Sequence, residues 1–232
     1  MSSGSDSAAG GGRADARAGV EVALERADPY WPAQAAVAAA LILYVLLPDK
    51  LTLGPEWLVP SAEGLLLAGL ILNTPRGGRA EGTRRRLVAT VLLACVTIVN
   101  LVSLGLLVHF IVASGRAHGY ELMLSGAQIW GTNVLIFAVC YWELDRGGPG
   151  ARRVWRAAKP DFLFPQDTLP RGERWRPAFV DYLYTSFTNA TAFSPTDTMP
   201  LSASSKLLML LQAFTALVTV GLVVARAINA FG

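Results

Sequence analysis

Residues 87–113 read LVATVLLACVTIVNLVSLGLLVHFIVA, an apolar run that contains no Asp, Glu, Lys or Arg. A helix needs about 20 predominantly apolar residues to cross the hydrocarbon core of a bilayer. This run exceeds that length and therefore predicts a membrane-spanning helix. It is the longest of several such runs, and the class of fold follows from them.

The composition of the whole chain agrees with a membrane protein. Apolar residues make up 53% of the 232 residues and charged residues only 16%, against about 25% charged in an average soluble domain. Further apolar runs cover residues 31–47, 57–72, 122–142 and 207–230. The predicted fold is an all-α integral membrane protein with five transmembrane helices. A shorter segment at 178–193 is either pore-helix-like or a sixth span.

The order of these runs divides the chain into four parts. Residues 1–28 are rich in Gly, Ser and Ala and predict a disordered tail without a secretory signal. Residues 29–143 form a four-helix transmembrane region. Residues 144–177 are a basic, Pro-rich interfacial linker, and residues 178–232 hold the short segment and the last helix.

Basic residues indicate the orientation. The tail has three Arg, the loop at 76–86 has five and the linker has eight Lys or Arg, whereas the loops around Lys50 and Arg116 have one each. Excess Lys and Arg mark cytoplasmic segments, so the N-terminus and the linker are expected in the cytoplasm, with the chain in a bacterial inner membrane. Arg226 favours a crossing at 178–193. If that segment instead enters and returns, the last helix ends outside.

Four of the polar side chains inside the predicted spans are candidates for a role there: Glu63, Asn100, His109 and Asn133. An ionisable residue at the centre of a span costs about 2.5–3.5 kcal/mol on the insertion scale. Glu63 is therefore either a functional site, or a carboxyl that is bonded to a neighbouring helix or lies near the interface. Asn100 and Asn133 are typical of residues that join helices in lipid. His109 is either a proton-relay group or structural.

The linker combines arginine with aromatic residues and five prolines. Arg152, Arg153 and Arg156 are candidates for contact with anionic lipid headgroups. The prolines prevent one long helix, so an irregular strap with short helical turns is expected.

Residues 183–200 read LYTSFTNATAFSPTDTMP. This stretch resembles the pore helix and selectivity filter of tetrameric potassium channels, with matches at Leu183, Tyr184, Ser186, Thr191, Asp197 and Pro200. The resemblance implies that the last span is a pore-lining helix. It implies a pathway lined by Thr188, Asn189, Thr191, Ser194, Pro195, Thr196, Asp197 and Gln212. Ser194 and Thr196 replace the two filter glycines, so potassium-type selectivity is not expected.

A second resemblance covers more of the chain. The runs WELDRGGP and PDFLFPQ, together with the 183–200 block, are similar to a group of multi-spanning bacterial membrane proteins that has no assigned activity. This resemblance implies a fold class and a membrane location.

Two functions remain open from the sequence. One is an ion-channel-like protein, expected to form a homo-oligomer and to pass a monovalent cation. The other is a non-conducting structural or interaction protein, in which the hydroxyls of 183–200 bond backbone carbonyls and the linker binds membrane lipids. No catalytic motif, metal-ligand cluster or cofactor-binding loop is found, so an enzyme is not expected. The basic residues form no single face for nucleic acid.

Overall fold

The computed structural model describes residues 29–48, 51–52, 58–72, 83–113, 119–153, 159–169, 175–191 and 197–231. The long helices are α2 (Trp31–Val45), α3 (Leu58–Leu72), α4 (Thr83–Ala113), α5 (Gly119–Leu144), α7 (Phe179–Thr191) and α8 (Ala203–Phe231). The linker holds η2 (Asp145–Gly147), α6 (Pro149–Arg153), strand β1 (Phe162–Leu163) and η3 (Pro165–Thr168), and strand β2 (Met199–Pro200) precedes α8. These short turns and the two-residue strand agree with the irregular strap predicted for the linker.

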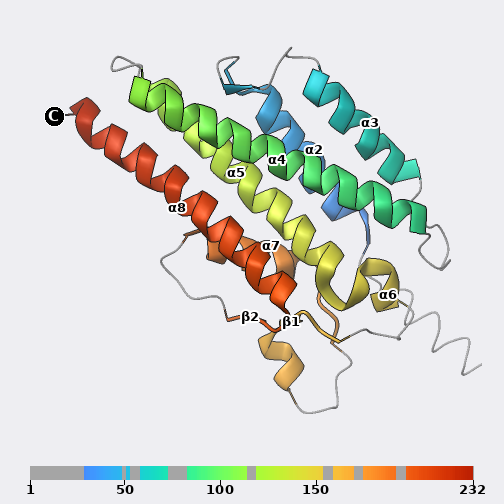
Figure 1. Ribbon diagram of the computed structural model, residues 1–232. Helices are drawn as coiled ribbons and strands as arrows, with labels where there is room; N and C mark the ends of the chain where they lie inside the picture. The colour runs from blue at the N-terminus through green and yellow to red at the C-terminus, as the bar shows by residue number, and fades with distance from the viewer. Residues whose placement is uncertain are drawn as a thin grey trace, which may run out of the picture.

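Helix α5 is the centre of the bundle, where it contacts α2, α4, α7 and α8 (Figure 1). The start of α2 lies beside the end of α5, with the rings of Tyr30 and Trp142 5.6 Å apart. At the opposite end, Gln128 Nε2 of α5 donates to Leu46 O just after α2, at 3.1 Å. The start of α4 also meets the end of α5, through Arg85 and Glu143. Both α2 and α4 therefore run antiparallel to α5.

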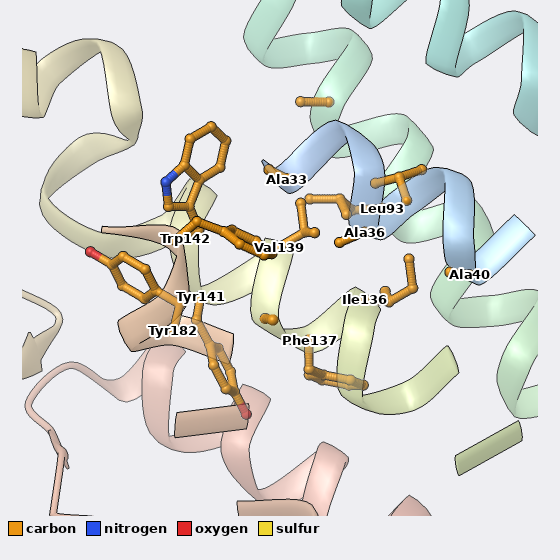
Figure 2. Packing of buried hydrophobic residues seen from close by; sticks show 14 of the residues in the cluster. Ala33, Ala36, Ala40, Leu93, Ile136, Phe137, Val139, Tyr141, Trp142 and Tyr182 are labelled. Atoms are coloured by element: carbon orange, nitrogen blue, oxygen red, sulfur yellow. The ribbon is translucent and has the colours of Figure 1, made fainter. Parts of the chain in front are cut away.

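The bundle has two distinct ends. We call the end that holds the start of α4, the end of α5 and the linker the linker end, and the opposite end the far end. The face between α2 and α5 is packed through small residues of α2, Ala33, Ala36 and Ala40, which lie beside Ile136 and Val139 of α5 (Figure 2). Small residues let two helix backbones approach closely, as in helix pairs within membranes.

Helix α8 has its polar residues inside and its apolar residues outside. Gln212, Thr215 and Thr219 are at most 1% exposed. Leu207, Leu210, Phe214 and Leu217 are at least 60% exposed. A surface helix of a soluble protein shows the opposite arrangement. The outer surface of α8 is thus suited to hydrocarbon.

Three of the described helices are long and apolar enough to span a membrane: Thr83–Ile111, Leu122–Gly147 and Ala203–Ala225. These segments coincide with the third, fourth and last predicted spans. The first and second predicted spans are helical as expected, but α2 and α3 have only 15 residues each. Helices of that length rise about 22 Å, which is shorter than a hydrocarbon core of about 30 Å.

Helix α7 does not cross the bundle. It starts at the linker end and runs antiparallel to α5, where Ser186 Oγ donates to Val134 O at 2.6 Å. Its last turn lies beside the middle of α5, because Trp130 Nε1 donates to Ala190 O at 3.4 Å. With 13 residues, α7 rises about 20 Å.

After α7 the chain returns to the end from which it came. Thr185 Oγ1 lies 3.1 Å from Thr198 Oγ1, and β2 pairs antiparallel with β1, Phe162 opposite Pro200. Helix α8 starts there and ends at the far end (Figure 1). Residues 179–191 therefore do not traverse the bundle as the favoured crossing at 178–193 requires, and Arg226 belongs to the half of α8 that leads to the far end. The hydrogen bonds of Ser186 to Val134 O and of Asn189 to Met209 O hold α7 beside the middle of α5 and the first half of α8.

Helices α5 and α8 touch at Gly126, which predicts sensitivity to a side chain there. A Cβ atom at Gly126 would come within 2.2 Å of Val223 Cγ2, and a helical Val has one strongly preferred rotamer. Gly126→Leu is expected to lower the free energy of unfolding by about 1–3 kcal/mol through overpacking. The melting temperature in detergent measures the effect.

Gly221→Leu is the matched control, because Gly221 is exposed on α8 and a Cβ there meets nothing within 4 Å. Equal melting temperatures for the two variants would contradict the close contact between α5 and α8.

Candidate functional site

The structure describes five of the eight predicted pathway residues, and they lie in different surroundings. Ser194, Pro195 and Thr196 lie outside the described residues, and Asp197 is exposed at the linker end. Thr188 Oγ1 donates to Tyr184 O at 2.9 Å, and Thr191 Oγ1 donates to Thr188 O at 2.8 Å. Both hydroxyls are thus bonded to carbonyls of their own helix.

Asn189 and Gln212 belong to a buried polar cluster between α5, α7 and α8. Gln212 Oε1 accepts hydrogen bonds from Tyr141 Oη at 2.5 Å and from Asn189 Nδ2 at 2.8 Å. Gln212 Nε2 donates to the backbone oxygen of Ser186 at 2.9 Å and to its Oγ at 2.6 Å. Both amide hydrogens and both oxygen lone pairs of Gln212 are therefore used.

Asn133 joins the same cluster from α5. Its Nδ2 donates to Gln212 O at 3.2 Å, and Asn189 Nδ2 also donates to Met209 O at 3.0 Å. We call Asn133, Tyr141, Ser186, Asn189 and Gln212 the mid-bundle cluster. It fixes the depth of α7 against α5 and α8.

The other polar residues within the helices are separate from this cluster. Glu63 is 3% exposed, and neither carboxyl oxygen has a hydrogen-bond partner among the described residues. Asn100 and Ser103 are 6% and 2% exposed and lie on a buried face of α4. His109 is exposed near the far end of α4. Among the described residues no group of His, Cys, Asp and Glu could hold a metal ion.

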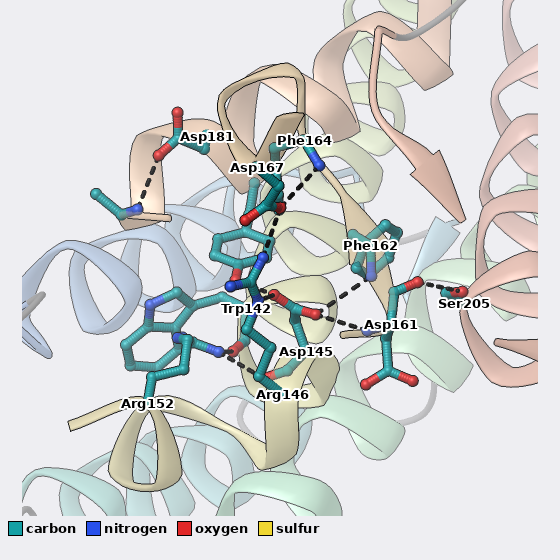
Figure 3. A network of polar contacts seen from close by, with 12 residues as sticks. Trp142, Asp145, Arg146, Arg152, Asp161, Phe162, Phe164, Asp167, Asp181 and Ser205 are labelled. Atoms are coloured by element: carbon teal, nitrogen blue, oxygen red, sulfur yellow. Dashed lines mark hydrogen bonds and ion pairs between the residues drawn. The ribbon is translucent and has the colours of Figure 1, made fainter. Parts of the chain in front are cut away.

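A second polar cluster lies at the linker end and was not predicted. It is centred on Asp145, which is completely buried. Asp145 Oδ1 accepts from the backbone N–H of Asp161 at 2.8 Å and of Phe162 at 3.2 Å. Oδ2 accepts from Tyr182 Oη at 2.6 Å. One carboxylate therefore joins the end of α5 to the linker strand and to α7 (Figure 3).

Arg146 extends this cluster to η3. Its Nε lies 3.3 Å from Asp145 Oδ2, and its Nη2 donates to Asp167 Oδ2 at 2.6 Å. Arg146 adopts a left-handed backbone conformation with a φ of 54°, and the next two residues are glycines with φ of 78° and 92°. Only glycine takes such angles readily, so the Gly-Gly pair allows the sharp turn that ends α5.

The start of α8 is held by the same segment. Asp161 O accepts the backbone N–H of Leu201 at 2.8 Å and the Oγ of Ser205 at 3.0 Å. Asp145, Arg146, Asp161, Asp167 and Tyr182 are called the linker-end cluster below. This cluster and the mid-bundle cluster clamp α7 at its start and near its end.

Two arginines of basic segments are buried inside the protein. Arg152, expected at lipid headgroups, is 7% exposed, and its Nη1 donates to Trp142 O at 2.8 Å and Asp145 O at 2.7 Å. Its guanidinium also lies 5.5 Å from the Trp142 ring and 5.2 Å from the Tyr182 ring. The Arg152 side chain therefore lies in the interior and not at lipid headgroups, because backbone carbonyls and aromatic rings replace water around its charge.

Arg85 makes a bidentate ion pair with Glu143, at 2.6 and 3.3 Å, and lies 4.4 Å from the Tyr30 ring. The side chains of Arg153 and Arg156 lie outside the described residues, so their contact with headgroups stays a prediction.

Comparison of the chain with protein-family models, with curated proteins and with solved structures gives no significant match. The resemblances noted in the sequence stay predictions, and the function has to be argued from the geometry of the chain itself.

Proposed function

We propose that this chain is a multi-pass membrane protein with five spanning helices and one re-entrant hairpin. The apolar outer surface of α8 and the three long apolar helices support a membrane location. Helices α2 and α3 are 15 residues long, and such short spans are tolerated where the bilayer thins or flanking residues reach the interface. The hairpin is formed by α7 and the chain that returns to β2.

The linker end is proposed to face the cytoplasm of a bacterial cell. Arg84, Arg86, Lys159 and Lys206 are exposed there, and the linker carries eight basic residues against four acidic ones. An excess of Lys and Arg is typical of the cytoplasmic side. Five crossings then bring the chain before α2 to the cytoplasm and the end of α8 to the outside.

The hairpin is proposed to line an ion-channel-like pathway. The observation that carries this proposal is the half-depth course of α7, followed by the return of the chain beside Thr185. A pore loop has this arrangement: a short helix stops within the membrane, a segment leads back to the same side, and a long helix follows. Non-helical backbone at membrane depth is tolerated where it is buried or lines a water-filled cavity.

A pathway of this kind requires several copies of the chain. One hairpin cannot surround an ion, so the proposal includes a homo-oligomer, with hairpins meeting at the symmetry axis. Asp197, which is exposed at the linker end, would attract a monovalent cation to the mouth. The filter positions carry Ser194, Pro195 and Thr196 in place of Gly-rich sequence, so the proposed pathway is not potassium-selective.

One observation favours the alternative, a non-conducting structural or interaction protein. Every hydrogen-bonding position of the Gln212 side chain is used inside one copy of the chain. A fully satisfied polar cluster joins helices without any need for water or ions. Under this alternative α7 is a brace for α5 and α8.

Ionic current in planar bilayers tests the proposal. Wild-type protein is expected to conduct monovalent cations, and Asp197→Ala is expected to lower the unitary current roughly tenfold at low salt, because a mouth carboxylate concentrates cations. The difference should shrink at high salt as the charge is screened.

Asp161→Ala is the control for this measurement. Asp161 lies at the same end, but its hydrogen bonds within the described chain are made by its backbone. Absence of current from wild-type protein that is correctly inserted into vesicles would reject the pore and leave the brace.

A further inference from the structure

An apolar groove runs along the outer surface of the bundle between α5 and α7. Its volume is about 470 Å³. Trp130, Gly131 and Val134 of α5 form its floor, and Val180, Tyr184 and Phe187 of α7 form one wall. Its lining is almost entirely apolar. Exposed apolar grooves are typical of sites for hydrophobic ligands or partners.

The shape of the groove is fixed by specific contacts. The Trp130 ring meets the Phe187 ring edge to face, with centroids 5.6 Å apart, and its Nε1 donates to Ala190 O. Gly131 packs against α2, since a Cβ there would lie 3.2 Å from Leu43 Cδ1. Helix α2 therefore lies close to the part of α5 that lines the groove.

The groove extends from the linker end toward the middle of the bundle. Val180 is in the first turn of α7, at the linker end, and Phe187 is seven residues further along the helix, about 10 Å deeper. An occupant with an apolar tail in the groove would have its other end beside the linker.

The charge at that end indicates the chemistry of the occupant. The linker has eight Lys or Arg against four Asp or Glu. Arg146 is paired with Asp145 and Asp167, and Arg152 is buried, which leaves six basic residues against two acidic ones. Trp175 and Arg176 lie four and three residues before the start of α7 at Phe179, and the Trp175 ring packs on the Phe164 ring at 5.5 Å. Trp is enriched at the interface of a bilayer, and basic residues attract anionic headgroups. A second protein helix would gain nothing from this excess of positive charge unless it were acidic.

We propose that the groove binds one acyl chain of an anionic phospholipid, with its headgroup at the basic linker. This inference rests on the membrane location proposed above, and it holds for both a conducting and a non-conducting protein. The lipid would cover the outer face of α7 that the bundle leaves open and would hold the hairpin against α5.

Quenching of tryptophan fluorescence by brominated lipids tests the inference in vesicles of phosphatidylcholine. Brominated phosphatidylglycerol or brominated phosphatidylcholine is added in increasing mole fraction, and the contribution of Trp130 is the difference between wild type and Trp130→Phe. Half-maximal quenching of Trp130 is expected at a roughly fivefold lower fraction of phosphatidylglycerol than of phosphatidylcholine, the preference that about one Lys or Arg contact gives.

A blocking variant and a matched control accompany this titration. Val180→Phe fills the opening of the groove. In this variant, half-maximal quenching of Trp130 is expected to require as high a fraction of phosphatidylglycerol as of phosphatidylcholine. Leu207→Phe, on α8, is expected to leave the preference unchanged, since Leu207 and Val180 are almost equally exposed, at 66% and 65%.

Two results would overturn the inference. Equal quenching of Trp130 by both lipids would show that the groove meets only bulk lipid. Quenching of the exposed Trp31 without any quenching of Trp130 would show that protein fills the groove. Flotation with the vesicles checks the membrane location separately, so a chain that fails to float rejects the proposed function as well.

Discussion

Asp145→Ala is expected to lower the free energy of unfolding by about 3–5 kcal/mol, the loss typical of breaking a buried ionic network by removing one partner. Asp145 is completely buried. Its removal takes the acceptor from two backbone N–H groups and from Tyr182 Oη. It also leaves Arg146 without one of its two carboxylates. The linker, α7 and the start of α8 should separate from the end of α5.

The melting temperature in detergent and limited proteolysis of the linker measure this change. Asp145→Asn keeps the shape and one acceptor oxygen, so it should lose less stability than Asp145→Ala. Asp161→Ala keeps the backbone groups that bond Asp145 and should remain close to wild type. An Asp145→Ala protein as stable and as resistant to protease as wild type would contradict the linker-end cluster.

Gln212→Leu is expected to have the second largest effect, a loss of about 2–4 kcal/mol. The substitution removes the partner of Tyr141 Oη and one acceptor of Asn189. It also leaves Ser186 without a donor to its backbone oxygen from α8. A buried polar group left without a partner costs about 1–3 kcal/mol, although single hydrogen bonds between membrane helices average only about 0.6 kcal/mol.

Thr219→Val is the control on the same face of α8. Thr219 is 1% exposed, and its hydroxyl donates only to Thr215 O of its own helix, so its loss should change stability by less than about 1 kcal/mol. The stability measurement also separates the two proposed functions. A stable Gln212→Leu protein with an altered ionic current would place Gln212 on the pathway and not in a brace.

The long apolar helices were predictable because hydropathy alone decides which stretches can sit in hydrocarbon. Residues 87–113 and 122–142 lie within helices α4 and α5 almost end to end. The start of α4 was placed four residues too late. Arg84, Arg85 and Arg86 were assigned to a loop by their charge, although Arg85 extends the helix and is buried at 2% exposure.

The clusters were not predictable, because their partners are far apart along the chain. Glu143 is 58 residues from Arg85, and Tyr182 is 37 residues from Asp145. In the sequence Asp145 is only a charge that follows an apolar run, and Arg152 is one of eight similar charges in the linker. The run ELDRGGP was noted for a resemblance, and its Gly-Gly pair was the one local signal of the sharp turn that brings Asp145 inside.

The course of α7 was open for a related reason. Its 13 residues are both a short span and a long half-helix, and hydropathy cannot separate these. The hydrogen bonds of Ser186 and Asn189 distinguish the half-helix from a short span, because their partners lie on α5 and α8.

The dependence of α7 on α8 also constrains how the protein is made. A ribosome completes α7 before it reaches Gln212, and during that interval Asn189 lacks the acceptors that α8 supplies. At the proposed membrane location hydrocarbon offers no substitute for them, so we expect the nascent half-helix to stay at the headgroup layer until α8 emerges and the two helices to enter together. Translation arrested before residue 212 would strand α7 at the membrane surface, within reach of quality-control proteases.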